Sequence, residues 1–150
     1  MNGEELVQIA TITEADLSAL SHLYGLLFPT TTPLTRMKQI FVKMNNSSGY
    51  LLLGAKAGNR LVGSAMGVIC ASLSGDCRPF MVIENIVVSP ESRDKGIGKA
   101  LLQELELQAA ARNCCYAILV SKMGREYAHV FLRSLGYNMD EYRGFKKHFK

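Results

Sequence analysis

The segment from residue 80 to residue 113 most constrains what this chain can fold into. Its first part, FMVIENIVV at residues 80–88, is apolar and rich in β-branched residues, which is typical of a buried strand. Pro90 follows this run, and from Ile97 to Asn113 leucines recur with a helical period. A short basic loop that contains two glycines joins the two elements. A strand, such a loop and a long helix in this order predict an α/β fold.

The loop at residues 93–99, RDKGIGK, has the composition of an anion-binding site. Gly96 and Gly98 allow backbone N–H groups to approach a ligand without an intervening Cβ. The first N–H groups of a helix lack intrahelical partners, and the helix dipole favours an anion there. Arg93, Lys95 and Lys99 add positive charge. The loop is therefore expected to hold a pyrophosphate.

Two other phosphate loops fit this sequence less well. A dinucleotide fingerprint needs a third glycine, where this chain has Leu101. A Walker loop needs an earlier glycine and a hydroxyl after the lysine, where this chain has Ala100. The remaining alternative is a helix start softened by glycine, with solvated lysines around it.

The whole chain is expected to form one domain over residues 1–150, a mixed and mostly antiparallel sheet with helices on both faces. The expected strands are 6–10, 50–57, 61–72, 80–88, 115–120, 137–139 and 143–149, and the expected helices are about 14–27, 35–44, 97–113 and 125–135. Gly58-Asn59 is typical of a tight hairpin turn. Thr13 and Asp16 have the spacing of a capping box, and Gly136 suits the end of the last helix.

Composition excludes several classes of protein. The 17 basic and 13 acidic residues give a net charge of +4, which is too mild to indicate a nucleic-acid partner. No apolar run reaches membrane-spanning length and the first residues lack the layout of a signal peptide, so we expect a cytoplasmic protein without a membrane partner. The cysteines lack the spacing of metal ligands, so no metal site is expected. We expect all of them to be free thiols. They are Cys70, Cys77, Cys114 and Cys115.

Two stretches resemble a known family. ENIVVSPESRDKGIGKALL is similar to motif A of the GNAT family of N-acetyltransferases, with Arg93, Gly96 and Gly98 at the three defining places. Ala128 and Phe131, followed by SLGY at 134–137, resemble the motif B helix of the same family. The resemblance implies the GNAT-like acyl-CoA N-acyltransferase fold and a transferase that uses acetyl-CoA as cosubstrate.

The resemblance also implies a donor site. In the family, a β-bulge in the fourth strand frees backbone groups for the pantetheine arm, and one freed N–H polarises the thioester carbonyl. The following fifth strand, ending here near Ser121, splays away and makes room for the donor. By position, the pantetheine contacts fall on Ile86, Val87 and Val88, and the pyrophosphate contacts on Arg93, Asp94, Lys95, Gly96, Ile97, Gly98 and Lys99.

Glu84 is the candidate general base. Acetyl transfer needs a neutral amine, because an ammonium has no lone pair. Glu84 is the one carboxylate on the strand that leads to the expected bulge, and alternation places it on the same side as residue 82, where many relatives have their base. Apolar surroundings would suit a base that works near neutral pH. The alternative is a glutamate that is hydrogen-bonded for structure.

The general acid is unassigned. The tyrosine that usually follows the motif B phenylalanine is Leu132 here, and a frequent asparagine is Arg125. His129 lies one helical turn before Leu132, and a histidine side chain can serve as a proton donor near neutral pH. A partly exposed helix histidine without a catalytic role is the alternative, and Tyr127 points elsewhere on the helix.

The acceptor is expected to be a primary amine on a small, anionic metabolite. IENIVV at 83–88 and the Ala128-His129 pair are similar to glucosamine-phosphate and aminoalkylphosphonate N-acetyltransferases. A non-catalytic acyl-CoA binder, or an enzyme that acts on a protein lysine or N-terminus, remains an alternative. A closed pocket under FPTTTP at 28–33 and residues 138–142 would favour a metabolite. Whether the chain forms a homodimer is left open.

Overall fold

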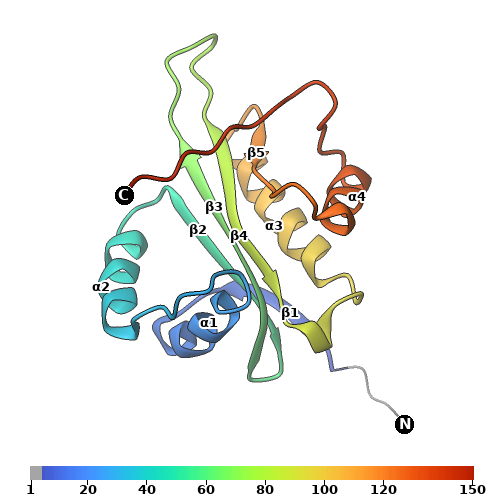
Figure 1. The fold of residues 1–150 in the computed structure, drawn as a ribbon. Coiled ribbons are helices and arrows are strands. Elements are labelled where there is room, and N and C mark those ends of the chain that lie inside the picture. Colours follow the sequence, from blue (N-terminus) through green and yellow to red (C-terminus); the bar gives the residue numbers. More distant parts are fainter. Residues whose placement is uncertain (1–4) are drawn as a thin grey trace. The chain divides into compact units, whose positions relative to one another are not determined.

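The computed structural model describes residues 5–150 (Figure 1). The chain divides into two compact units, one that ends at Ile118 and one that spans Leu119–Lys150. The expectation of a single domain over residues 1–150 stays a prediction.

The first unit is built on a mostly antiparallel sheet, as expected from the sequence. The strands are β1 (Val7–Thr11), β2 (Tyr50–Ala57), β3 (Arg60–Cys70), β4 (Phe80–Val88) and β5 (Ala117–Leu119), in the order β1-β2-β3-β4-β5. The pairs β1–β2, β2–β3 and β3–β4 are antiparallel. The helices of this unit are η1 (Glu14–Asp16), α1 (Leu17–Tyr24), α2 (Leu34–Asn45), η2 (Pro90–Ser92) and α3 (Ile97–Ala111), whereas α4 (Glu126–Ser134) belongs to the second unit. The mixed α/β fold with helices around the sheet is confirmed.

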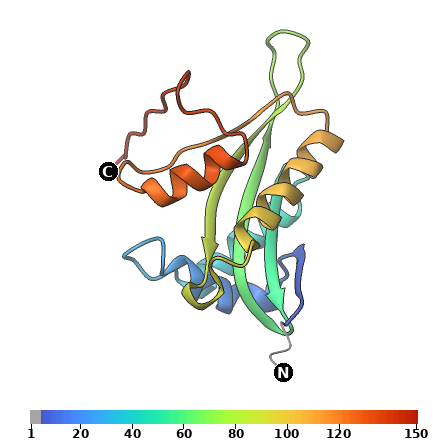
Figure 2. The same ribbon diagram turned by 90° about the vertical axis from the view of Figure 1, so that its right-hand side faces the viewer.

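Helices lie on both faces of the sheet (Figures 1 and 2). On one face α3 packs closely, because Gly67 of β3 leaves room there: a Cβ at this position would lie 3.0 Å from both Leu105 and Met81. On the other face, Ile12, Leu17 and Leu20 form a buried cluster with partly buried residues of α1, α2 and β2 around it.

Several local expectations are confirmed. Thr13 and Asp16 form the capping box, with the Thr13 N–H donating to Asp16 Oδ2 at 2.8 Å. Ala57 pairs with Arg60 across a two-residue turn, and Gly58 takes the left-handed conformation that this turn requires, with φ of +56°.

The first helix is shorter than expected. It ends at Tyr24, and the N–H groups of Leu26 and Leu27 bond three residues back, to Leu23 and Tyr24. These bonds tighten the chain into turns before Pro29 instead of extending the helix. Leu26 and Phe28 are consequently exposed.

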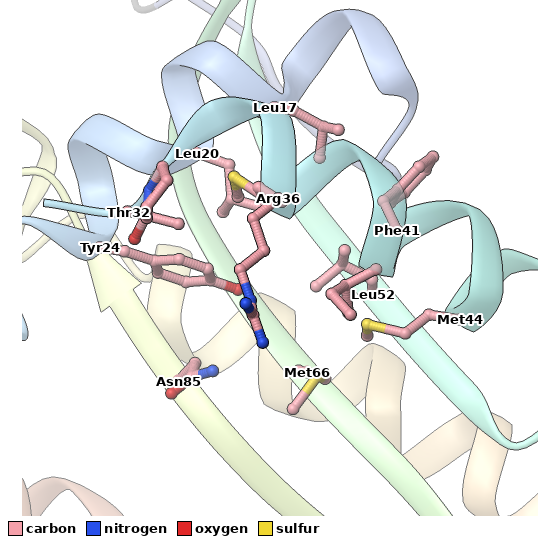
Figure 3. A pocket seen from close by; sticks show the side chains of 13 residues that line it. Leu17, Leu20, Tyr24, Thr32, Arg36, Phe41, Met44, Leu52, Met66 and Asn85 are labelled. Carbon is pink, nitrogen blue, oxygen red and sulfur yellow. The ribbon is translucent and has the colours of Figure 1, made fainter.

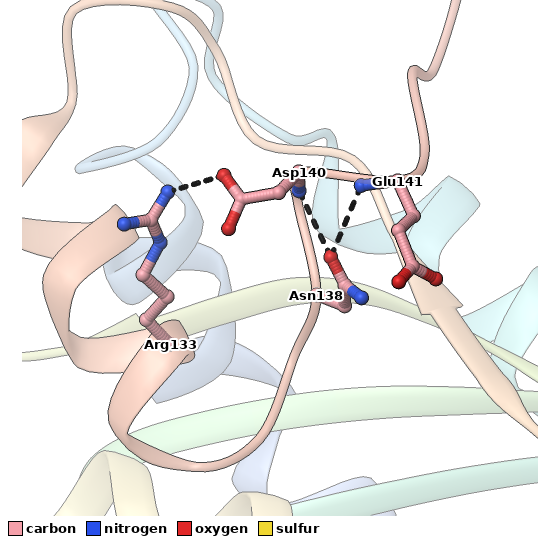
Figure 4. A network of polar contacts seen from close by, with 4 residues as sticks. All are labelled: Arg133, Asn138, Asp140 and Glu141. Atoms are coloured by element: carbon pink, nitrogen blue, oxygen red, sulfur yellow. Dashed lines mark hydrogen bonds and ion pairs between the residues drawn. The ribbon is translucent and has the colours of Figure 1, made fainter.

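The second unit contains α4 and the C-terminal segment. Gly136, with φ of +88°, ends α4 as expected: its N–H bonds Arg133 O at 3.0 Å, and the Tyr137 N–H bonds Leu132 O at 3.1 Å. Residues 138–141 then turn locally, because Asn138 Oδ1 accepts the backbone N–H groups of Asp140 and Glu141 (Figure 4).

The expected strands at 137–139 and 143–149 are wrong, since residues 137–150 form no strand. The side-chain bonds of Asn138 compete with strand pairing at the first of them. In the second, Phe145 and Phe149 are 88% and 87% exposed, so its apolar alternation has no buried face to support it. Among residues 5–150, no helix is both long and apolar enough to cross a bilayer.

Candidate active site

A bulge interrupts β4 where the family resemblance implied one. Met66 of β3 pairs with Glu84, whereas Ser64 pairs with Val87, so that two residues of β4 lie opposite one residue of β3. Asn85, the first of the two, has φ of +56°. Asparagine is among the few residues that adopt this left-handed conformation readily, which explains its place in an apolar strand.

The bulge changes which side chains of β4 share a face. Residues paired across antiparallel strands point to the same side, so Leu52, Met66 and Glu84 form one row across β2, β3 and β4. Ser64 and Val87 belong to a neighbouring row on the same face, because Ser64 and Met66 are two residues apart. Glu84 and Val87 therefore face the same side although they are three residues apart.

Glu84 is more exposed than its apolar strand suggested. Its side chain lies on the α1 and α2 face of the sheet, yet it is open to solvent. No residue in 5–150 makes a hydrogen bond or ion pair with its carboxylate. The expected apolar surroundings are thus wrong, and so is the alternative of a glutamate hydrogen-bonded for structure within this part of the chain.

A cavity of about 370 Å³ lies on the same face (Figure 3). Its wall is mostly apolar and comes from α1, α2, the loop between them and three strands. The lining residues include Leu17, Leu20, Tyr24, Thr32, Pro33, Arg36, Met37, Ile40, Phe41, Met44, Leu52, Met66 and Asn85. Asn85 belongs to the bulge, so the cavity borders the bulge, and Glu84 is the neighbour across the strands of Met66 in the cavity wall.

Tyr24 links α1 to the bulge at one end of this cavity. Burial raises the pKa of its phenol, and hydrogen bonding with the side chains of Asn85 and Ser64 opposes that rise. Ser64 Oγ also donates to Leu53 O at 2.8 Å, which ties this end of the cavity to β2. The phenol is therefore neutral at ordinary pH and fixes the polar end of the cavity.

The anion loop adjoins the end of β4. Arg93 Nε donates to Val88 O at 3.2 Å, which ties the loop to the strand. Asp94 and Gly96 both have positive φ, +61° and +76°, and Gly96 caps the start of α3. Ile97 differs from its neighbours because its side chain is buried in the core, so only its backbone can face a ligand.

The opposite end of β4 is held by the chain that leads into β5. The Met81 N–H donates to Tyr116 O at 3.0 Å, and the Phe80 and Tyr116 rings stack with centroids 5.1 Å apart. β5 has three residues and β4 has nine, so β5 accompanies only part of β4. Ile86, Val87 and Val88 lie at the end far from this pairing.

The two residues considered as general acid, His129 and Tyr127, belong to the second unit, as does Leu132 at the place of the usual tyrosine. Leu132 is buried, His129 is partly buried and Tyr127 is exposed, all on α4. The His129 N–H donates to Arg125 O at 3.1 Å as part of the helix. A catalytic role for His129 stays a prediction.

The described residues contain no cluster of three or more His, Cys, Asp or Glu side chains that could hold a metal ion. All four cysteines are free thiols, as expected. Burial raises the pKa of the Cys114 thiol, and its neighbour Cys115 adds to the rise.

Comparison with known proteins identifies the class. The model of the acetyltransferase (GNAT) family matches residues 17–137, and the chain belongs to this family. A search among curated proteins finds no significant match.

Solved structures share the fold over nearly the full length. A Trypanosoma brucei acetyltransferase has 25% identity and a TM-score of 0.83, with 95% of this chain and 100% of that chain covered. Glucosamine-6-phosphate N-acetyltransferase from Arabidopsis thaliana has 18% identity and a TM-score of 0.88, with 97% and 100% covered. The structure of AAC(6')-Iy with the bisubstrate analogue CoA-S-monomethyl-acetylneamine has 18% identity and a TM-score of 0.80, with 97% and 99% covered.

Sequence reasoning predicted the strand β4 and the glycine loop as elements of the fold but not the cavity. Its polar lining residues are Tyr24, Thr32, Arg36 and Asn85. Two of them carried a signal. Arg36 lies four residues before Ile40, on the same helical face as the apolar side chains of α2, and Asn85 is a turn-forming residue inside a β-branched run.

Proposed function

We propose that this chain transfers the acetyl group of acetyl-CoA directly to the primary amine of a small metabolite. The observation that supports this most is the bulge at Asn85 and Ile86, a few residues before the glycine loop that begins α3. A bulge leaves backbone groups of its strand without ladder partners. Membership in the family supports acetyl-CoA as the donor.

The loop fits a pyrophosphate. Apart from Gly96 and its two chain neighbours, no residue in 5–150 has an atom within 4 Å of the position that a Cβ on Gly96 would occupy, so open space borders the backbone there. Arg93, Lys95 and Lys99 are exposed around it. The backbone N–H groups of residues 94–99 would bind the phosphate oxygens, as the first turn of a helix does.

Bound acetyl-CoA would supply an activated thioester. The backbone of Ile86, Val87 and Val88 would line the pantetheine arm, and an N–H freed at the bulge would donate to the thioester carbonyl, where negative charge develops. Glu84 would accept a proton from the acceptor ammonium, directly or through a water, so that a neutral amine attacks the carbonyl carbon. Its exposed position suits transfer through water.

The cavity supports a small acceptor. A volume of about 370 Å³ is within the range of small-molecule sites, and its wall adjoins Glu84 through Met66. Residues Thr32 and Pro33 of the FPTTTP segment help to line it. A protein substrate would not need an apolar cavity of this kind.

One observation favours a second candidate, an acyl-CoA binder without catalysis: Leu132 stands where relatives have a tyrosine that protonates the leaving thiolate. The thiol of CoA, like that of cysteine, should have a pKa of about 8.5, so its thiolate is a tolerable leaving group. We therefore still expect slow turnover that rises with pH. Leu132→Tyr should raise the rate most at low pH and leave CoA affinity unchanged.

The donor site is tested by Gly98→Glu, which adds bulk and negative charge where the phosphates would lie. We expect CoA affinity, measured by calorimetry, to fall by about tenfold or more. Gln103→Glu is the control, because it adds the same charge further along α3. Unchanged affinity in the folded Gly98→Glu protein would remove the loop from the donor site.

The reaction is tested with a panel of amines and acetyl-CoA, followed as release of free thiol. Turnover of at least one small amine is expected. Tight CoA binding without thiol release for any amine, peptide or protein in the panel would favour the non-catalytic binder.

A further inference from the structure

The cavity on the α1 and α2 face has one cationic side chain in a largely apolar wall. Its apolar lining residues include Met37, Ile40, Phe41, Met44 and Leu52. Such a wall favours a hydrocarbon or aromatic group, with about fourfold tighter binding for each methylene buried. Sugar hydroxyls against this wall would lose their hydrogen bonds with water and find no replacement.

Arg36 is the cation. It projects from the first turn of α2, and Figure 3 shows its guanidinium directed toward the Tyr24 hydroxyl and Met66. It makes no hydrogen bond or ion pair with any residue in 5–150. The next cation of α2, Lys38, contrasts with it, because Lys38 pairs with Glu14 at 4.0 Å.

A guanidinium at the edge of an apolar cavity matches a planar anion, since its fork of N–H donors binds carboxylate or phosphate oxygens in pairs. The protein supplies no such anion to Arg36 within the described residues. Asn85 and Tyr24 lie at the same polar end (Figure 3). The acceptor amine must also come to this end, because the bulge and Glu84 adjoin it.

We propose that Arg36 determines specificity by selecting an acceptor in which a carboxylate or phosphonate lies close to the reacting amine on an apolar body. The anion binds Arg36, the amine lies toward Glu84, and the apolar body fills the space between α2 and β2. This rests on the proposed acetyltransferase function and narrows it from amines in general to apolar amino acids and their analogues.

The test compares acceptors with one apolar body: phenylalanine, its decarboxylated form 2-phenylethylamine, and the phosphonate analogue of phenylalanine. Glucosamine 6-phosphate serves as an anionic amine without an apolar body. For the wild type we expect kcat/KM to be about tenfold or more higher with the carboxylate or the phosphonate than with 2-phenylethylamine. The better of the two anions identifies which one the site prefers.

Arg36→Gln should abolish this preference, and Arg36→Lys should retain part of it. Lys43→Gln, a cation of the same helix that does not line the cavity, should leave the preference intact. Turnover without a preference for the anion, a preference that survives in Arg36→Gln, or a preference for glucosamine 6-phosphate would overturn the proposal.

A binding experiment separates this proposal from the proposed function. If no amine is acetylated, anion selection by Arg36 is tested by calorimetry. The affinities of N-acetylphenylalanine and N-acetyl-2-phenylethylamine are then compared in the presence of CoA. Tighter binding of the carboxylate form that is lost in Arg36→Gln supports anion selection by Arg36 in a protein that lacks turnover. Equal binding of the two overturns the proposal.

Discussion

The two helices that cover opposite faces of the sheet bury their apolar residues to very different degrees. α3 fully buries five side chains, Ile97, Leu101, Leu102, Leu105 and Ala109. α2 has no buried residue, and its Ile40 is 43% exposed. Both helices carry an apolar face, so the difference lies in what that face contacts. On the α3 side it meets closely packed strands, and on the α2 side it borders a cavity.

The comparison shows how one sheet serves stability and binding at once. Glycines at 63 and 67 bring α3 so close that an added Cβ on Gly63 would lie 3.2 Å from Ile97. No similar approach occurs at α2, where Met37 and Phe41 are only partly buried. Apolar surface left open in this way is typical of a binding site. A ligand that fills the cavity would complete the packing of α2.

The largest expected effect follows from this contrast in packing. Leu105→Ala on α3 removes a side chain with no exposed surface and should lower the free energy of unfolding by about 2–5 kcal/mol. Ile40→Ala on α2 should lower it by less than about 1.5 kcal/mol, because Ile40 is 43% exposed and the higher helix propensity of alanine offsets part of the lost burial. Urea unfolding measures both. Similar losses in the two variants would mean that the α2 face is as well packed as the α3 face.

The second prediction separates the chemistry of the two faces. Glu84→Gln keeps the shape of the side chain and removes the base, so kcat/KM should fall by about 10²-fold near neutral pH. The loss should shrink at high pH, where free amine is already abundant. Glu104→Gln on α3 is the matched control, since it changes a carboxylate in the opposite layer and can keep its bond with Gln108.

The pH dependence decides the role of Glu84. A loss that is equal at all pH values would mean that Glu84 positions the acceptor. An unchanged rate would leave it without a role.

The fold was predictable from the sequence where the signal is local. The leucine period of α3, the Gly58-Asn59 turn and the glycine before Ile97 each depend on neighbouring residues alone, and the structure has all three. The sequence likewise predicted a helix at α2, with apolar side chains along it. It could not predict that they border a cavity, because that depends on how far the helix lies from the sheet.

The rest depended on contacts between distant segments. The left-handed Asn85 is held where β3 and β4 shift register, a relation that no local pattern encodes. The C-terminal alternation around Phe145 and Phe149 resembled a strand, but a strand forms only where another strand and a buried face receive it.

The smallest expected effect concerns how the α1 and α2 layer is held despite its open packing. Asp16, where η1 passes into α1, pairs with Lys56 of β2 at 2.8 Å, and only 14% and 27% of the two side chains are exposed. Burial alone raises the pKa of Asp16, but the contacts with Lys56 and Thr13 outweigh it, so that the pKa lies below its ordinary value. Asp16→Asn should therefore lower the free energy of unfolding by about 1 kcal/mol at pH 7.

The sign of the pH dependence follows from the lowered pKa of Asp16. The unfolded chain takes up the proton first as pH falls, so the stabilisation is complete above the ordinary pKa of 3.8 and is lost as pH falls through the lower folded value. Wild type and Asp16→Asn should converge in stability there.

The matched control is Asp140→Asn in the second unit, which breaks the pair with Arg133 at 2.7 Å between side chains that are 75% and 56% exposed. Solvent screens such a pair, so this change should cost less than about 0.5 kcal/mol. Equal losses in the two variants, measured by urea unfolding between pH 2.5 and 7, would show that the Asp16 pair contributes no more than an exposed one and that the apolar cluster of Ile12, Leu17 and Leu20 holds the layer by itself.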